Sequence, residues 1–143
     1  MQIQDVMSTN VASVSTEDSV AVAARLLSRR NVGVLPVLGP GGRLKGIVTD
    51  RDIVLRCVAA SFDPAMTRVR QIMSSNPLSL HPEDSAETAG KLMAQNQVRR
   101  LPVTENGRLV GLVSLSDLAS SPVHQDEAAS AFQHICSNLS ANL

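Results

Sequence analysis

Apolar residues recur with two different periods along the first part of the chain, and each period predicts a different kind of element. The runs 32–38 and 43–49 are short and apolar, and Gly41-Gly42 between them suits a hairpin turn. The run 11–14 predicts a shorter strand, and 50–60 predicts a helix after the hairpin. Another helix is predicted where apolar residues recur at helical spacing, at Val20, Ala23, Ala24, Leu26 and Leu27. The predicted order is therefore β-α-β-β-α.

The same pattern occurs a second time. The segment 6–19, VMSTNVASVSTEDS, aligns with 72–85, IMSSNPLSLHPEDS, and the tripeptide LPV occurs at both 35–37 and 101–103. After the hairpin turn the spacing between the copies is one residue shorter, as expected if the second turn has one residue fewer. A strand at 78–80 then corresponds to the one at 11–14. We therefore predict two tandem copies of one structural unit.

The duplication predicts the domain organisation. Repeat 1 is expected at 1–60, a linker at 61–70, repeat 2 at 71–121 and a tail at 122–143. A single β-α-β-β-α unit of this size leaves one face of its sheet apolar, so we expect two pseudo-symmetric repeats packed through their sheets into one α/β body. A C-terminal helix, packing on this body or on a second subunit, is predicted from an apolar stripe at Ala128, Ala131, Phe132, Ile135 and Leu139.

Composition and charge exclude several classes of function. The chain has 13 basic and 13 acidic residues, so no net charge draws it to nucleic acid or to an anionic membrane. Phe62 and Phe132 are its only aromatic residues, too few for a base-stacking platform. No signal peptide opens the sequence, and no apolar run approaches the roughly 20 residues of a membrane span. We expect a cytoplasmic protein that binds neither nucleic acid nor membranes.

The residue types that carry catalysis or bind metals occur without suitable partners. His81, His124 and His134 have no Ser, Cys or Asp partner at a catalytic spacing, and no histidine pair has zinc-helix spacing. Cys57 and Cys136 do not make a disulfide framework, and their role is left open between a bridge and unreactive thiols. We therefore expect no enzyme, no metal site and no required cofactor.

A heptapeptide with a hydroxyl and a carboxylate at fixed spacing occurs once in each copy. It reads GIVTDRD at 46–52 and GLVSLSD at 111–117. The hydroxyl is expected at the end of a strand, and Asp52 or Asp117 in the first turn of the next helix. Two interpretations remain open, since these residues stabilise a helix start without any ligand, but they can also face a common cleft.

Together these features resemble a tandem pair of CBS domains over residues 5–120. The resemblance rests on the DVMS and QIMS openings, the LPV strands and two G-h-x-[ST]-x-x-D motifs in the right order. The short chain, with TDRDIV, VRRLPV and the AFQHICS tail, is similar to the stand-alone bacterial type. The resemblance implies an adenosine ligand between the repeats, with the Asp accepting from ribose hydroxyls and the Ser or Thr bonding phosphate or ribose. Gly46 and Gly111 would leave room for it, and first-turn amides would remain free for an anion.

The resemblance further implies two unequal clefts. The first would use Thr49, Arg51, Asp52, Leu78, Leu80, Arg99 and Arg100, and its guanidinium groups suit phosphate oxygens. The second would use Val11, Gly33, Val34, Ser114, Ser116 and Asp117, which suits a nucleoside or no ligand. Salt bridges to carboxylates are the alternative role for Arg99 and Arg100.

These expectations combine into a regulatory module. The ligand class is AMP, ADP, ATP or S-adenosylmethionine, the output goes to an unknown protein partner, and the resemblance implies a homodimer. The alternative is a ligand-free dimeric interaction scaffold in which the motif residues only cap helices. The sequence leaves open which adenosine compound binds and whether both clefts are used.

Overall fold

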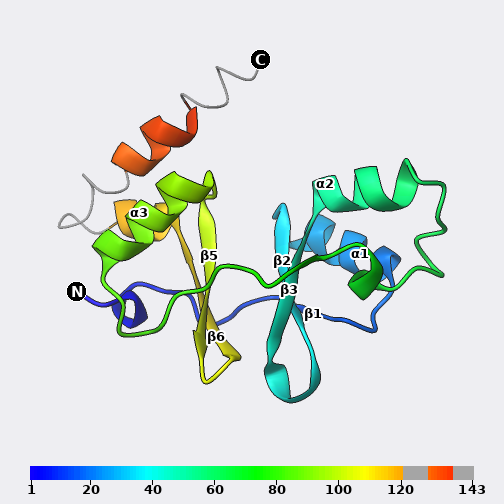
Figure 1. Cartoon of the computed structure of the whole chain (residues 1–143), viewed down its shortest axis with the longest axis horizontal. Coiled ribbons are helices and arrows are strands. Elements are labelled where there is room, and N and C mark those ends of the chain that lie inside the picture. Colours follow the sequence, from blue (N-terminus) through cyan, green and yellow to red (C-terminus); the bar gives the residue numbers. More distant parts are fainter. Residues whose placement is uncertain (121–128, 137–143) are drawn as a thin grey trace. The chain divides into compact units, whose positions relative to one another are not determined.

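The computed structural model describes residues 1–120 and 129–136, which form two compact units (Figure 1). The first-repeat unit consists of Ala12–Pro77 together with Gly107–Leu109. The second-repeat unit consists of Met1–Val11, Leu78–Asn106 and the described residues from Val110 onward. Among the described residues, no helix has both the length and the apolar character needed to cross a bilayer.

The first-repeat unit is a four-stranded sheet with helices packed beside it. Its strands run in the order β1-β2-β3-β4, with β1 parallel to β2 and the other neighbours antiparallel. Helices α1 and α2 contact one another on one side of this sheet (Figure 1). The elements are β1 Val14–Ser15, α1 Val20–Arg30, β2 Val34–Leu38, β3 Leu44–Thr49, α2 Asp50–Ile53, which continues as a π-helical turn at Val54–Val58, and β4 Ser74–Ser75.

Local sequence signals explain where these elements begin and end. The hydroxyl of Ser19 accepts from the amide of Val22 at 3.2 Å and caps α1, whose last turn ends at Asn31 in the left-handed conformation. Gly41 and Gly42 have positive φ in the turn between β2 and β3, as the hairpin prediction requires. The apolar face of α1 packs into the core of this unit, which contains Val14, Val20, Ala23, Leu27, Leu35, Val37, Val48, Ile53, Cys57, Val69 and Ile72.

The second-repeat unit has the same order of elements around a smaller, two-stranded sheet. Strands β5 and β6 pair, the turn between them uses positive φ at Asn106 and Gly107, and Ser85 caps α3 by accepting from the amide of Thr88 at 3.1 Å. Leu80 forms a single parallel bridge with Val103, where the sequence predicted a short strand at 78–80. The elements are α3 Ala86–Asn96, β5 Arg100–Glu105, β6 Arg108–Ser114, α4 Leu115–Ala119 and a C-terminal helix at 129–136. The first two residues of β6 are counted with the first-repeat unit.

The C-terminal helix packs on the second-repeat unit through part of its predicted stripe. Ala131 is buried in the core of this unit, and Ile135 is also buried. Phe132 is half exposed, so it does not belong to the buried face. Ala128 and Leu139, the other members of the predicted stripe, lie outside the described residues.

Each unit contains the opening segment of the other repeat. In the first-repeat unit, Ser74 and Ser75 of β4 pair with Ile47 and Gly46 of β3. In the second-repeat unit, Ser8 exchanges two backbone hydrogen bonds of 2.8 and 2.9 Å with Leu112. The predicted boundaries therefore follow the two copies in the sequence. In the structure, the segment that opens each copy belongs instead to the unit of the other copy.

The segment predicted as a linker contributes to the first-repeat unit. Thr67 and Val69 are buried, and the amide of Val20 donates to the carbonyl of Thr67 at 2.8 Å. The amide of Val69 likewise donates to the carbonyl of Asp18 at 2.8 Å. Residues 67–69 are therefore packed against the start of α1.

Candidate functional site

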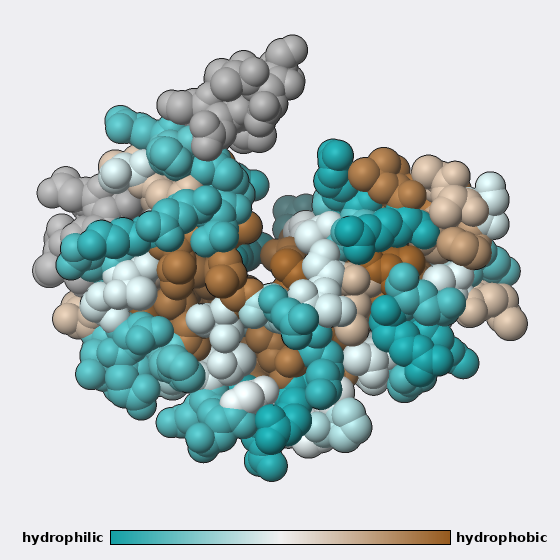
Figure 2. All heavy atoms as spheres, in the orientation of Figure 1, coloured by the Kyte–Doolittle hydropathy of each residue, from teal (hydrophilic) through white to brown (hydrophobic). Residues whose placement is uncertain are grey.

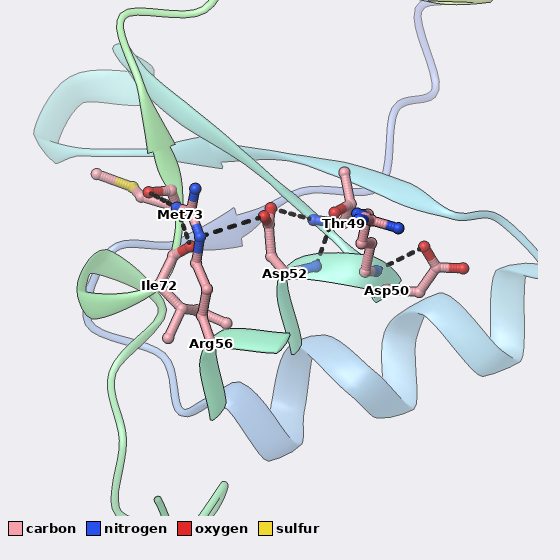
Figure 3. A network of polar contacts seen from close by, with 7 residues as sticks. Thr49, Asp50, Asp52, Arg56, Ile72 and Met73 are labelled. Atoms are coloured by element: carbon pink, nitrogen blue, oxygen red, sulfur yellow. Dashed lines mark hydrogen bonds and ion pairs between the residues drawn. The ribbon is translucent and has the colours of Figure 1, made fainter. Parts of the chain in front are cut away.

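The first motif forms a reciprocal cap where β3 meets α2 (Figure 3). Thr49 is the last residue of β3, and its Oγ1 accepts from the amide of Asp52 at 3.0 Å. Oδ2 of Asp52 in turn accepts from the amide of Thr49 at 3.0 Å. The hydroxyl and the carboxylate therefore hold each other in place at the turn from strand to helix.

The second motif forms the same cap where β6 meets α4. Oγ of Ser114 accepts from the amide of Asp117 at 3.1 Å, and Oδ2 of Asp117 accepts from the amide of Ser114 at 2.8 Å. The predicted positions, a hydroxyl at a strand end and an Asp in the first helical turn, are observed in both copies. The capping interpretation accordingly describes a real contact in each repeat.

Capping occupies only one oxygen of each carboxylate. In both motifs Oδ2 accepts the capping hydrogen bond, and Oδ1 accepts none from any described residue. The side chain of Asp52 is 13% exposed and that of Asp117 is partly buried. A carboxylate oxygen accepts more than one hydrogen bond, so the cap leaves acceptor capacity on both Asp52 and Asp117.

Arg56 distinguishes the first motif from the second. Its Nε lies 3.8 Å from Oδ1 of Asp52, and its Nη1 donates to the carbonyls of Ile72 at 3.1 Å and Met73 at 3.5 Å (Figure 3). Among the described residues, Asp117 has no such cation beside it. Arg56 is not among the site residues predicted from the sequence, although an Asp and an Arg four residues apart on a helix are a recognised ion-pair spacing.

The expectation of free first-turn amides is wrong for the first motif. The amide of Asp50 donates to the carbonyl of Gly33 at 3.0 Å, and that of Arg51 donates to Oδ1 of Asp50 at 2.8 Å. The amide of Asp52 is occupied by the cap. These groups are satisfied by neighbouring atoms of the same unit, so an anion there must be bound by side chains.

The expectation that Gly46 and Gly111 leave room for a ligand is also wrong. A Cβ on Gly46 would lie 2.5 Å from the carbonyl oxygen of Ser74, and a Cβ on Gly111 would lie 2.5 Å from the sulfur of Met7. The space above each glycine is filled by the exchanged opening segment of the other repeat. Glycine is therefore needed for a close approach of the chain to itself.

The other predicted residues of the first cleft differ in exposure. Leu80 is 1% exposed and belongs to the core of the second-repeat unit, whereas Leu78 is largely exposed. Arg51, Arg99 and Arg100 are exposed, and the described residues of their own units offer none of them an ion-pair partner. Arg51 lies in the first-repeat unit with Thr49 and Asp52, and the other four residues lie in the second-repeat unit. Their assembly into one cleft stays a prediction.

The predicted second cleft is divided in the same way. Gly33 and Val34 lie in the first-repeat unit, and Val11, Ser114, Ser116 and Asp117 lie in the second-repeat unit. Within the second-repeat unit, the carbonyl of Arg99 accepts from the amide of Leu115 at 2.8 Å. The backbone of Arg99 therefore adjoins the second motif, as that of Gly33 adjoins the first.

The cysteines and histidines form no cluster in the described part of the chain. No group of three or more His, Cys, Asp or Glu residues there could hold a metal ion. Cys57 is a buried free thiol whose Sγ lies 3.6 Å from the carbonyl oxygen of Phe62, and Cys136 is a partly buried free thiol. His124 lies outside the described residues.

Comparisons with known proteins identify the duplicated unit. The sequence profile of the family described as CBS domain matches residues 3–58 and 69–124. The CBS domain-containing protein YhcV of Bacillus subtilis is 44% identical over 133 residues, which are 93% of this chain and 94% of that protein. Hypoxic response protein 1 of Mycobacterium tuberculosis is 33% identical over 116 residues, 81% of each chain.

Solved structures share the fold. A crystal structure of Hypoxic Response Protein I with two coordinated zinc ions matches with a TM-score of 0.78 at 32% identity, covering 84% of this chain and 98% of that one. The CBS domain pair of MJ0100, in complex with 5′-methylthioadenosine and S-adenosyl-L-methionine, matches with a TM-score of 0.71 at 24% identity, covering 84% and 94%. The predicted α/β fold and the predicted resemblance are confirmed. This chain belongs to the CBS domain family and contains two CBS domains in tandem.

Proposed function

We propose that this CBS pair is a regulatory module of the cytoplasm that binds an adenosine-containing ligand at its two capping motifs. The ligand class is AMP, ADP, ATP or S-adenosylmethionine. One observation carries the proposal: the cap in each repeat uses Oδ2 and leaves Oδ1 of the Asp without a hydrogen-bond donor among the described residues. A ribose diol supplies two hydroxyl donors, and a carboxylate is the side chain best suited to accept both.

The two clefts of this proposal are those expected from the sequence. The first combines Thr49, Arg51 and Asp52 with Leu78, Arg99 and Arg100, and the second combines Val11, Gly33 and Val34 with Ser114, Ser116 and Asp117. The guanidinium groups of Arg51, Arg99 and Arg100 are exposed and have no ion-pair partner among the described residues of their units, which supports a role in binding phosphate. Leu80 is left out because it is packed in a core.

The module would act by binding and signalling, without a reaction of its own. A ligand changes the output only if it binds two states of the module with different affinity. In this proposal the two states differ in how the repeats or the subunits of a homodimer pack, and a partner protein recognises one of them.

The proposal is tested by thermal unfolding with AMP, ADP, ATP, S-adenosylmethionine and NAD on the wild type and on Asp52→Asn. A ligand at about 100 times its dissociation constant stabilises the folded state by roughly 2.7 kcal/mol, which raises the midpoint by several degrees. Asparagine keeps an oxygen for the cap but loses the charged acceptor, so we expect Asp52→Asn to lose most of this shift.

Asp18→Asn is the matched control. Oδ2 of Asp18 accepts from the amide of Ser15 at 2.8 Å, a carboxylate-to-amide contact like that of Asp52 but outside the motif. This variant should keep the full ligand-induced shift. If none of the compounds moves the wild-type midpoint, or if both variants lose the shift equally, the proposal is wrong.

An interaction scaffold is the second candidate, and exposed apolar residues favour it. Val54, Val58, Phe62 and Met66 are all more than half exposed, and Figure 2 shows apolar surface over α2 and the segment after it. Such a surface is typical of a protein interface. A scaffold would show no ligand-induced shift, so the same unfolding experiment separates the two candidates.

A further inference from the structure

The two motif carboxylates differ in the charge beside them. Asp52 has the guanidinium of Arg56 at 3.8 Å, whereas the structure gives Asp117 no cation among the described residues. Arg51 adds a second positive charge within the first motif, where the second motif has Ser116. Asp50 adds a second negative charge to the first motif, so the formal charges of Asp50, Asp52, Arg51 and Arg56 cancel. No cation among the described residues offsets the charge of Asp117 in the second motif.

The position of Arg56 is set by groups other than Asp52. Its Nη1 donates to the carbonyls of Ile72 and Met73, which precede β4 in the same unit (Figure 3). These carbonyls are uncharged, so they hold the guanidinium without cancelling its charge. The Arg56 side chain is 54% exposed and that of Asp52 is 13% exposed, so the cation lies on the solvent side of the pair.

We propose that Arg56 determines the ligand class of the Asp52 site by offsetting the Asp52 charge, so that this site accepts an adenosine ligand carrying phosphate. The Asp117 motif, without such a cation, favours a neutral or cationic adenosine compound. This inference rests on the proposed function, and it adds a reason for the two sites to select different ligands.

The physical reason is the short distance between ribose and phosphate in any nucleotide. When the ribose hydroxyls bind Oδ1 of Asp52, a phosphate on the same sugar lies within the roughly 8–10 Å over which exposed charges interact at physiological salt. An isolated carboxylate repels that phosphate, whereas the pair of Asp52 and Arg56 does not. A neutral nucleoside lacks the phosphate and is almost insensitive to this difference.

The test is isothermal titration of AMP and adenosine into Arg56→Gln, Arg56→Lys and Arg70→Gln, all in the full chain. An Asp117→Asn background restricts the titration to the Asp52 site. Arg56→Gln should weaken AMP binding about tenfold and adenosine binding less than about twofold, as expected for one charge interaction in a partly exposed site. Arg56→Lys keeps the charge and should retain most of the AMP preference.

Arg70→Gln is the matched control. Arg70 lies in the same unit and pairs with Glu17 at 2.7 Å, so this change removes one positive charge without touching Asp52. It should leave the ratio of the AMP and adenosine affinities unchanged. Added salt should lower the ratio of the AMP affinity to the adenosine affinity in the Asp117→Asn protein. This second measurement needs no Arg56 variant.

The possible outcomes separate the inference from the proposed function. If Arg56→Gln weakens both ligands equally, or neither, Arg56 has at most a structural role and the inference is wrong while the binding site stands. An AMP preference that is independent of salt also contradicts it. If neither ligand binds to the background protein or to the wild type, the proposed function fails and the inference fails with it.

Discussion

The two repeats share the contacts that build their motifs and differ in the residues that surround them. Thr49 with Asp52 and Ser114 with Asp117 form the same reciprocal cap, with hydrogen bonds between 2.8 and 3.1 Å. Arg56 stands beside only the first of the two carboxylates in the described part of the chain. The comparison indicates that the cap belongs to the fold, whereas the charges around it differ between the copies, as the proposed difference in ligand class requires.

The same distinction applies to the glycines that precede the motifs. Gly46 and Gly111 occupy equivalent positions, and each faces an opening segment exchanged between the repeats. At Gly46 the nearest atom to an added Cβ is a backbone oxygen at 2.5 Å, whereas at Gly111 it is the flexible side chain of Met7, with the carbonyl of Ser8 at 3.1 Å. Equivalent positions therefore differ in how easily the neighbour can move.

The largest expected loss of stability follows from adding a methyl group at these glycines. Gly46→Ala should lower the free energy of unfolding by about 2–3 kcal/mol, because β4 must move away from β3. Gly111→Ala should cost about 1 kcal/mol, because the Met7 side chain can adopt another rotamer. Urea denaturation of the two variants measures both values.

Gly33→Ala is the control for this pair. Its Cβ would lie 3.5 Å from Oδ2 of Asp50, an ordinary contact, so the change should stay within about 0.5 kcal/mol of the wild type. If Gly46→Ala is tolerated as well as Gly33→Ala, the close approach of β4 to β3 is not needed for folding.

A smaller and more equal effect is expected from removing the two caps. Thr49→Ala and Ser114→Ala each lose a hydroxyl that accepts from an Asp amide, and each should cost about 1 kcal/mol without ligand. Thr49→Ser keeps the acceptor and should retain most of the stability. A clear loss in only one repeat would show that the caps are not equivalent.

The smallest effect on folding is expected at the exposed apolar surface of the first-repeat unit. Val58 is 59% exposed on the π-helical turn after α2, so Val58→Lys should change the free energy of unfolding by less than about 0.5 kcal/mol. If the expected homodimer forms through this surface, the variant should sediment as a monomer at concentrations where the wild type is a dimer.

Val22→Lys provides the comparison for the dimer measurement. Val22 is 37% exposed on α1 of the same unit and is not one of the five residues that define this surface, which are Val54, Leu55, Val58, Phe62 and Met66. It should leave the sedimentation coefficient unchanged. A Val58→Lys protein that sediments like the wild type would place the dimer interface elsewhere or remove it.

Most of the secondary structure could be predicted because its signals lie within a few residues of each other. The predicted helix beginning at Val20 and the hairpin turn at Gly41-Gly42 are both observed. The opening strands were less predictable, since β1 covers only Val14–Ser15 and Leu80 contributes a single bridge. Such short pairings depend on partners far away in the sequence, which local patterns do not contain.

The candidate site could be predicted only in part, for the same reason. The spacing of Thr49 and Asp52 is a local capping signal, so their mutual contact follows from the motif itself. The amide partner of Asp50 and the carbonyl partners of Arg56 come from Gly33, Ile72 and Met73, which are distant along the chain. Free amides were therefore expected where the folded chain has already satisfied them.

The sequence by itself determined the duplication, the order of elements in each copy, the family and the hydroxyl and carboxylate of each motif, because these depend on composition, period and short spacing. Only the tertiary structure decided that the opening segments are exchanged, that Gly46 makes room for the backbone of Ser74, and that Arg56 faces Asp52. These features depend on which segments meet in space, and that is settled by packing and hydrogen bonding across the whole unit.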